Sequence, residues 1–141
     1  MTDKQISGIM RDFLKAIELK DENKALSFFA DDGDWTAPEG FFNGKEELKR
    51  YLKWMSAVGQ EPVIAECNNG FMIQDNKAFS ELKITSTVRG KKIEYLELNA
   101  WEFNNDAKIK HFRVVYDRLF VCKQAAKGPI EKTLVKQYKV G

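Results

Sequence analysis

The hydrophobic pattern of this chain changes its period once, near Pro62, and this change constrains the fold more than any other feature. Before it, apolar residues recur every three or four positions, which is the spacing of amphipathic helices. After it, apolar and polar residues alternate, which is the spacing of β-strands with one buried face. Helices that precede strands, instead of alternating with them, predict an α+β domain.

The first part of the chain predicts three N-terminal helices. One apolar stripe runs over residues 6–17, and Asp21 is a candidate N-cap for a short second helix. A third helix opens at Asn43-Gly44. Between the second and third helices, residues 31–33 interrupt the pattern, and a short strand is expected over 34–38. The apolar face of the third helix comprises Leu48, Tyr51, Leu52 and Met55.

The second part predicts four long strands in an antiparallel meander, over 63–74, 77–88, 92–103 and 108–121. Short polar turns that suit hairpins separate them. The three helices must cover one face of this sheet. We expect the sheet to curve and to leave a cavity between itself and the helices.

The C-terminal segment differs in charge from the rest of the chain. Residues 123–141 contain five lysines and one acid, Glu131, whereas the whole chain has a net charge of only +2. After Gly128-Pro129, apolar residues recur every four positions, at Ile130, Leu134 and Tyr138. We therefore predict a domain over 1–122 and a basic helical extension over 123–141. Three interpretations of this extension are open: it docks on the sheet, it exchanges onto a partner subunit, or it lies on an acidic membrane surface. Its apolar stripe is short for stable membrane binding.

Composition excludes several classes of protein. A chain of 141 residues with 43% hydrophobic residues suits one globular domain with its own core. The small net charge argues against a dedicated nucleic-acid binder. Two cysteines, Cys67 and Cys122, and one histidine, His111, give no metal-ligand spacing, so no metal site is expected.

Targeting and cofactor motifs are also missing from the sequence. The N-terminus has no basic run followed by an apolar core, and no apolar run approaches the roughly 20 residues of a membrane span. We therefore expect a cytoplasmic protein without a membrane span. Since there is no phosphate-binding glycine motif and no nucleophile elbow, any chemistry is expected to need no cofactor.

The order of elements, with three local motifs, resembles the NTF2-like superfamily and, within it, the SnoaL-like and ketosteroid-isomerase-like branch. The motifs are Phe29-Ala30-Asp31-Asp32-Gly33-Asp34-Trp35, Phe42-Asn43-Gly44-Lys45-Glu46-Glu47-Leu48 and Lys108-Ile109-Lys110-His111-Phe112-Arg113-Val114-Val115-Tyr116-Asp117. The resemblance covers about residues 5–122 and implies a cone-shaped, cystatin-like fold with a pocket, and a homodimer that packs through the sheet. The superfamily contains isomerases, cyclases, epoxide hydrolases and non-catalytic binders, so the resemblance assigns no single activity.

Most catalytic positions of these relatives are not matched. At the positions of the ketosteroid isomerase base, tyrosine and protonated acid, this chain has Ala37, Phe13 and Asn99. Val114 stands where the last strand of limonene epoxide hydrolase-like proteins carries an aspartate. Asp117, however, matches an aspartate that serves as acid or base in some cyclases of the branch, and it is a candidate catalytic residue.

Strand alternation predicts which side chains face the cavity. One face of the strand over 92–103 carries Ile93, Tyr95, Glu97, Asn99, Trp101 and Phe103. The inward face of the last strand carries Phe112, Val114 and Tyr116. Alternation then leaves His111, Arg113 and Asp117 on the opposite face, unless a β-bulge turns Asp117 inward.

Glu97 is the principal catalytic candidate. Aromatic neighbours such as Tyr95 and Trp101 would desolvate its carboxyl group and raise its pKa, which suits a general acid or base near neutral pH. The alternative is a cross-strand ion pair with Lys83. Asn99 either binds a ligand or satisfies a neighbouring polar group. The expected ligand-binding residues are Trp35, Trp54, Tyr95, Asn99, Trp101, Phe112 and Tyr116.

The leading hypothesis is a SnoaL-like protein that binds a small, largely apolar molecule in a cone-shaped pocket. Glu97 or Asp117 would then serve as acid or base in an isomerisation, cyclisation or hydration. The alternative is a non-catalytic ligand-binding or homodimeric association domain. A third hypothesis is a regulatory protein that captures a partner through its basic tail.

Overall fold

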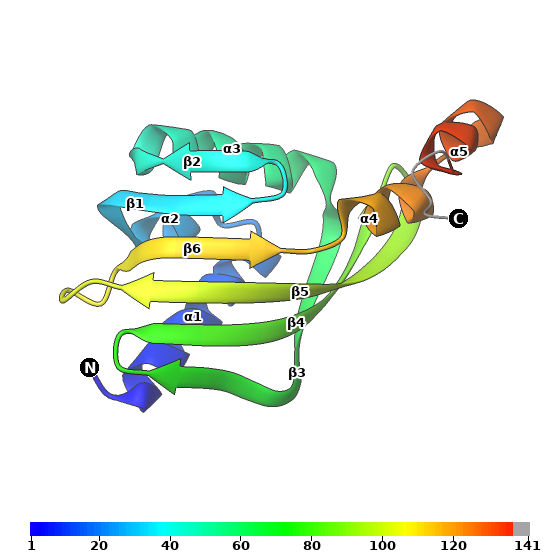
Figure 1. The fold of residues 1–141 in the computed structure, drawn as a ribbon. Coiled ribbons are helices and arrows are strands. Elements are labelled where there is room, and N and C mark those ends of the chain that lie inside the picture. Colours follow the sequence, from blue (N-terminus) through cyan, green and yellow to red (C-terminus); the bar gives the residue numbers. More distant parts are fainter. Residues whose placement is uncertain (137–141) are drawn as a thin grey trace.

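The computed structural model describes residues 1–136 and shows an α+β fold (Figure 1). Its elements in chain order are α1 (Asp3–Glu18), α2 (Glu22–Ser27), β1 (Phe29–Ala37), β2 (Gly40–Asn43), α3 (Gly44–Val58), β3 (Gln60–Gln74), β4 (Lys77–Val88), β5 (Lys91–Phe103), β6 (Ile109–Val115), α4 (Arg118–Ala125) and α5 (Gly128–Lys136). The three N-terminal helices and the α+β class are as the sequence predicts. Within the described residues, no helix is long and apolar enough to cross a membrane.

The strands form one sheet in the order β2-β1-β6-β5-β4-β3. Strands β3 to β6 make the predicted antiparallel meander. Strand β1 extends the sheet by pairing parallel to β6 and antiparallel to β2. The prediction of four meander strands was therefore incomplete, since the sheet also contains the β1–β2 hairpin.

Strand β1 is longer than predicted because Gly33 belongs to the strand and does not end it. A Cβ atom at Gly33 would lie 2.7 Å from the carbonyl oxygen of Ile109, so only glycine allows β6 to approach this closely. The register between β1 and β6 shifts between Phe29 and Asp34, which marks a bulge around this glycine. Asp31 and Asp32 before Gly33 have the composition of a turn, yet both are exposed residues of a strand.

Strand β6 ends earlier than predicted, at Val115 instead of residue 121. The chain then turns into α4, whose N-cap is Asp117: its carboxyl oxygen accepts a hydrogen bond from the backbone N–H of Phe120 at 3.0 Å. The expected boundary between 122 and 123 falls inside this helix.

The core lies between the N-terminal helices and one face of the sheet (Figure 1). The apolar stripe of α1 is buried as predicted, with Ile6, Met10 and Phe13 inaccessible to solvent. Phe13 lies at the centre of the core. Its ring meets five others edge-on at 5.4–6.0 Å, those of Phe28, Phe29, Trp35, Trp101 and Phe112. This aromatic cluster joins α1 to β1, β5 and β6.

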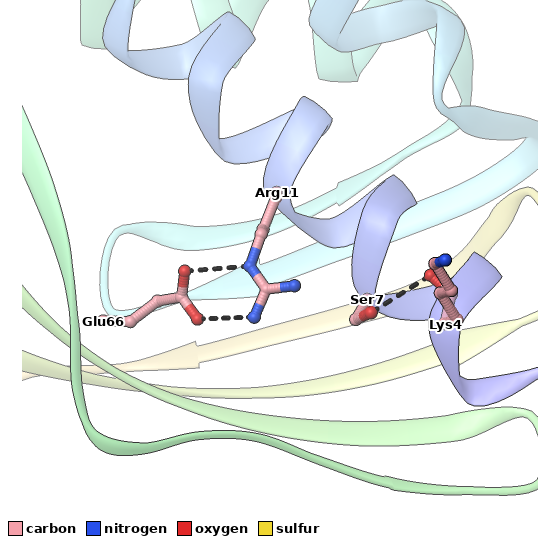
Figure 2. Close-up of polar contacts among 4 residues, drawn as sticks. All are labelled: Lys4, Ser7, Arg11 and Glu66. Atoms are coloured by element: carbon pink, nitrogen blue, oxygen red, sulfur yellow. Dashed lines mark hydrogen bonds and ion pairs between the residues drawn. The ribbon is translucent and has the colours of Figure 1, made fainter.

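Helix α1 also contacts the edge strand β3 through a bidentate ion pair (Figure 2). The Arg11 guanidinium donates to both carboxyl oxygens of Glu66, at 3.0 and 2.9 Å, and lies 4.8 Å from the ring centre of Phe71. The register of β3 on β4 shifts between Glu66 and Phe71. Arg11 therefore holds the irregular part of β3 against α1, whereas Ser7 in the same view bonds only within its own helix.

Helices α4 and α5 extend beyond the end of β6 (Figure 1). The side chain of Gln124 fixes α4 to β5 through two 2.8 Å hydrogen bonds with the backbone of Glu94. Helix α5 does not dock on the sheet through Ile130, because that side chain is 77% exposed. An ion pair between Arg89 and Glu131 holds it to the β4–β5 turn. The side chain of Leu134 and all of Tyr138 lie outside the described part.

Candidate functional site

A cavity of about 580 Å³ lies between the helices and the concave face of the sheet. Its volume falls in the range of small-molecule sites. Most of its wall is apolar, with side chains from α1 and α3 on one side and from β4, β5 and β6 on the other. Wall residues include Leu14, Ile17, Leu52, Met55, Leu82, Ile84, Ile93 and Val114.

Alternation along the strands determines which side chains reach the cavity, as the sequence predicts. On β5, Tyr95 and Glu97 line the wall, whereas Leu96 and Leu98 lie exposed on the outer face. On β6, the lining residues are Phe112, Val114 and Tyr116. The two strands pair with Trp101 opposite Phe112 and Asn99 opposite Val114, so both present the same face to the helices.

Glu97 lies in this apolar wall with its carboxyl group toward the cavity. Burial is the main cause that raises the pKa of Glu97 to about 7; a hydrogen bond from Asn99 acts in the opposite direction, and the nearby Glu39 makes a smaller raising contribution. The side chain is half-buried, and its accessible part faces the cavity. The alternative of an ion pair with Lys83 is wrong, because Lys83 pairs with Glu94 on the outer face.

A chain of hydrogen bonds through buried side chains ends at the Glu97 carboxyl group and fixes its position. The indole N–H of Trp101 donates to the Ser80 hydroxyl at 2.9 Å, and that hydroxyl donates to the amide oxygen of Asn99 at 2.8 Å. The Asn99 amide nitrogen then donates to Glu97 Oε1 at 2.9 Å. An indole nitrogen is only a donor, so it fixes the direction of every bond in the chain. Asn99 therefore always presents an N–H donor, and not its amide oxygen, to Glu97.

A second carboxyl group, that of Glu39, also lines the cavity. Its two oxygens accept hydrogen bonds from the hydroxyls of Tyr51, at 3.0 Å, and Tyr116. The ring of Tyr95 lies 5.0 Å from that of Tyr116. Burial raises the pKa of both Tyr51 and Tyr95 far above the usual value, so both remain protonated.

The sequence analysis did not identify Glu39 or Tyr51 as a polar pair. Glu39 lies in the turn between β1 and β2, and β2 was not predicted. The only signal in the sequence is Pro38 before Glu39, which marks a turn but not the direction of the glutamate side chain.

The other predicted site residues divide into two groups. Trp35 and Trp54 line the cavity, although Trp54 is 48% exposed at its edge. Asn99 and Trp101 lie behind the wall, where they support Glu97 and do not reach the cavity. The buried indole nitrogen of Trp35 has no hydrogen-bond partner among the described residues.

Asp117 does not line the cavity. Its side chain is exposed and caps α4, beyond the end of β6, so neither strand alternation nor the family pattern described its position. His111 lies on the outer face, where its Nδ1 is 2.6 Å from Asp34 Oδ2. Among residues 1–136, no group of three or more histidine, cysteine, aspartate or glutamate side chains has an arrangement that would hold a metal ion.

Comparison with protein families gives a match to the sequence model of the SnoaL-like domain, over residues 10–112. None of the curated proteins matches the chain significantly. The match runs from the middle of α1 to the middle of β6, so it includes Glu39 and Glu97 but not Val114 or Tyr116 of the cavity wall.

Several solved structures have the same fold. An NTF2-like protein of unknown function from Burkholderia pseudomallei has a TM-score of 0.79 at 17% identity, over 90% of this chain and 100% of its own. A hypothetical protein with a ketosteroid isomerase-like fold from Catenulispora acidiphila, solved in complex with trimethylamine, has a TM-score of 0.75 at 14% identity, over 83% and 91%. The epoxide hydrolase/cyclase-like enzyme SalBIII, which has a role in pyran ring formation in salinomycin, has 0.72 at 12%, over 84% and 95%.

Proposed function

Because the chain belongs to the SnoaL-like domain family, we propose that its cavity binds a small, largely apolar molecule on which Glu97 acts as a general acid or base. The observation that carries this proposal is the position of the Glu97 carboxyl, in an apolar wall that raises its pKa to about 7. A group with this pKa exchanges protons readily at neutral pH. Its supporting chain through Asn99 and Ser80 holds it in one orientation.

The reaction types that suit this site move a proton within one molecule. In an isomerisation, ionised Glu97 takes a proton from a C–H bond and returns it to another atom of the same molecule, so nothing is consumed. In a cyclisation or hydration, it takes the proton of an attacking hydroxyl or water, and the proton passes to the atom that leaves or is protonated. Neither reaction needs a cofactor.

The structural neighbours support a ligand-binding use of the fold. One of them is solved with trimethylamine, and another is an epoxide hydrolase/cyclase-like enzyme. Their low identity to this chain gives no substrate, so the proposal rests on the residues of the cavity itself.

The proposal is tested by identifying any small molecule that co-purifies with the protein, by mass spectrometry, and then measuring its turnover. Glu97→Gln should lose turnover by at least about a hundredfold at saturating ligand, since glutamine keeps the shape of the side chain but cannot take up or release the proton. Glu102→Gln is the matched control, because it removes the same charge from the same strand outside the cavity. Undiminished turnover in Glu97→Gln would contradict the catalytic role.

The second candidate function is a ligand-binding or association domain without chemistry, which acts as a homodimer. The outer face of the sheet favours it, because large apolar side chains are exposed there, among them Phe79, Leu96, Leu98 and Val115. Leu98 and Val115 are direct neighbours across β5 and β6. We propose that a second copy of the chain covers this face. Under this candidate, Glu97→Gln leaves ligand affinity unchanged and there is no turnover to lose.

A further inference from the structure

The polar groups inside the cavity are unbalanced in charge. Its interior contains two carboxyl groups, those of Glu39 and Glu97, which lie close enough for the charge of Glu39 to raise the pKa of Glu97. In the described part of the chain, neither forms an ion pair with a basic side chain. A carboxylate removed from water without a cation is unfavourable, so the interior lacks a positive partner.

The basic side chains at the cavity edge are already engaged elsewhere. Lys20 donates to the carbonyl of Ser56 and to Gln60, and Arg89 pairs with Glu131. Arg118 donates to the carbonyl of Pro38 at 3.3 Å. The acidic residues Asp21 and Glu22 lie at the same edge. The edge therefore adds no excess of positive charge that would neutralise the interior.

The walls around the two carboxyl groups are aromatic. Tyr95 lies near Glu97, Tyr116 bonds to Glu39, and the two tyrosine rings lie 5.0 Å apart between their centres. Aromatic faces attract cations, and most strongly where water is excluded. Both oxygens of Glu39 accept tyrosine hydroxyls, which is the pattern of an ionised carboxylate.

From this arrangement we infer that the cavity selects an organic cation, a molecule with an apolar body and an ammonium group that lies between Glu39 and Glu97 against the tyrosine rings. The inference rests on the proposed small-molecule function and narrows it to a substrate class. The apolar wall takes the body of the molecule, and the two carboxyl groups take its charge. A neutral molecule of the same shape would leave the carboxyl groups unpaired.

Choline and its uncharged carbon isostere 3,3-dimethylbutan-1-ol are the probes that separate charge from shape. Measured by calorimetry above the pKa of Glu97, choline should bind at least about tenfold more tightly than the isostere. Glu97→Gln and Glu39→Gln should each remove most of this preference, whereas Glu102→Gln, outside the cavity, should retain it.

Proton release gives an independent readout. A cation beside Glu97 lowers the pKa of its carboxyl, which in the free protein is about 7. Choline binding near that pH should therefore release roughly half a proton, measured by calorimetry in buffers of different ionisation enthalpy. The release should vanish in Glu97→Gln. Affinity for choline should rise as the pH increases through the same value.

The outcomes distinguish failure of the cation preference from failure of the proposed small-molecule function. Equal or tighter binding of the isostere overturns the cation preference and leaves the small-molecule function standing. Absence of binding by both probes also overturns it. If a neutral apolar probe such as 1-adamantanol fails to bind as well, the small-molecule function itself is contradicted.

Discussion

At the scale of single residues, the burial that raises the pKa of Glu97 suits it to proton transfer but also destabilises the folded protein when the carboxyl is ionised. Its pKa is about 7 in the folded protein, against an ordinary value of 4.5, so the folded state binds this proton more tightly than the unfolded chain does. The resulting stabilisation is fully present below the ordinary pKa and is lost as the pH rises toward 7. Above that, the folded protein carries an ionised carboxyl in an apolar wall.

We therefore predict that Glu97→Gln is more stable than the natural protein above neutral pH. Glutamine still accepts the Asn99 hydrogen bond and carries no charge to desolvate. The gain in unfolding free energy should be on the order of 2–3 kcal/mol at pH 8 and should vanish below the ordinary carboxyl pKa of 4.5. Urea denaturation at several pH values measures it. A variant that is less stable at every pH would show that Glu97 is not desolvated.

The buried hydroxyl of Ser80 provides a second prediction at this scale. Ser80→Ala leaves the Trp101 N–H and the Asn99 oxygen without their partner, which should lower the unfolding free energy by about 1–3 kcal/mol. Ser7→Ala is the control: Ser7 is only half-buried on α1 and its hydroxyl bonds within its own helix, so the change should be less than about 0.5 kcal/mol. Equal effects of the two substitutions would contradict the hydrogen-bond chain.

At the scale of elements, alternation predicted the inward faces of β5 and β6 because one buried face imposes a period of two. It did not predict where β6 ends. A polar residue after an apolar strand is compatible with a longer strand, a bulge or a helix cap. It can be recognised as a cap only if the helix that follows has been predicted, and α4 was not. Asp117 was considered for catalysis because it matches an aspartate of related cyclases, although its side chain caps the first turn of α4.

The capping role of Asp117 gives a prediction for α4. Asp117→Ala removes the acceptor of the Phe120 N–H and should lower the unfolding free energy by about 1 kcal/mol, whereas Asp117→Asn retains a good cap and should change it little. Both variants should bind the co-purified ligand or choline as the natural protein does. Loss of turnover in a stable Asp117→Asn variant would restore the family-based role.

At the scale of the whole molecule, the sequence predicts the class of fold and one wall of the cavity, but not the polar cluster around Glu39. The change of period near Pro62 is sufficient for helices packed on an antiparallel sheet. The Glu39 cluster, in contrast, depends on a hydrogen bond from Tyr116, 77 positions away in the chain. No periodicity links residues at that separation. The contact follows from β1 pairing parallel to β6, which the bulge at Gly33 permits.

The exposed apolar face of the sheet gives a prediction for the assembly. If a second copy covers it, Leu98→Lys should shift the protein from dimer to monomer in light scattering after size-exclusion chromatography, since it places charges at the centre of the interface. Leu19→Lys is the matched control, because Leu19 is 67% exposed at the end of α1, away from that face. A natural protein that is monomeric at all concentrations would contradict the dimer.

The ionisation of Glu97 in the free protein is the most direct test of the account. Carbon-detected NMR of protein labelled at glutamate side-chain carboxyls follows each group through a pH titration, and Glu97→Gln assigns the signal. The account predicts one glutamate that titrates near pH 7, displaced from all those at the surface. A Glu97 signal that titrates with the exposed glutamates would contradict the desolvated carboxyl on which the proposed chemistry depends.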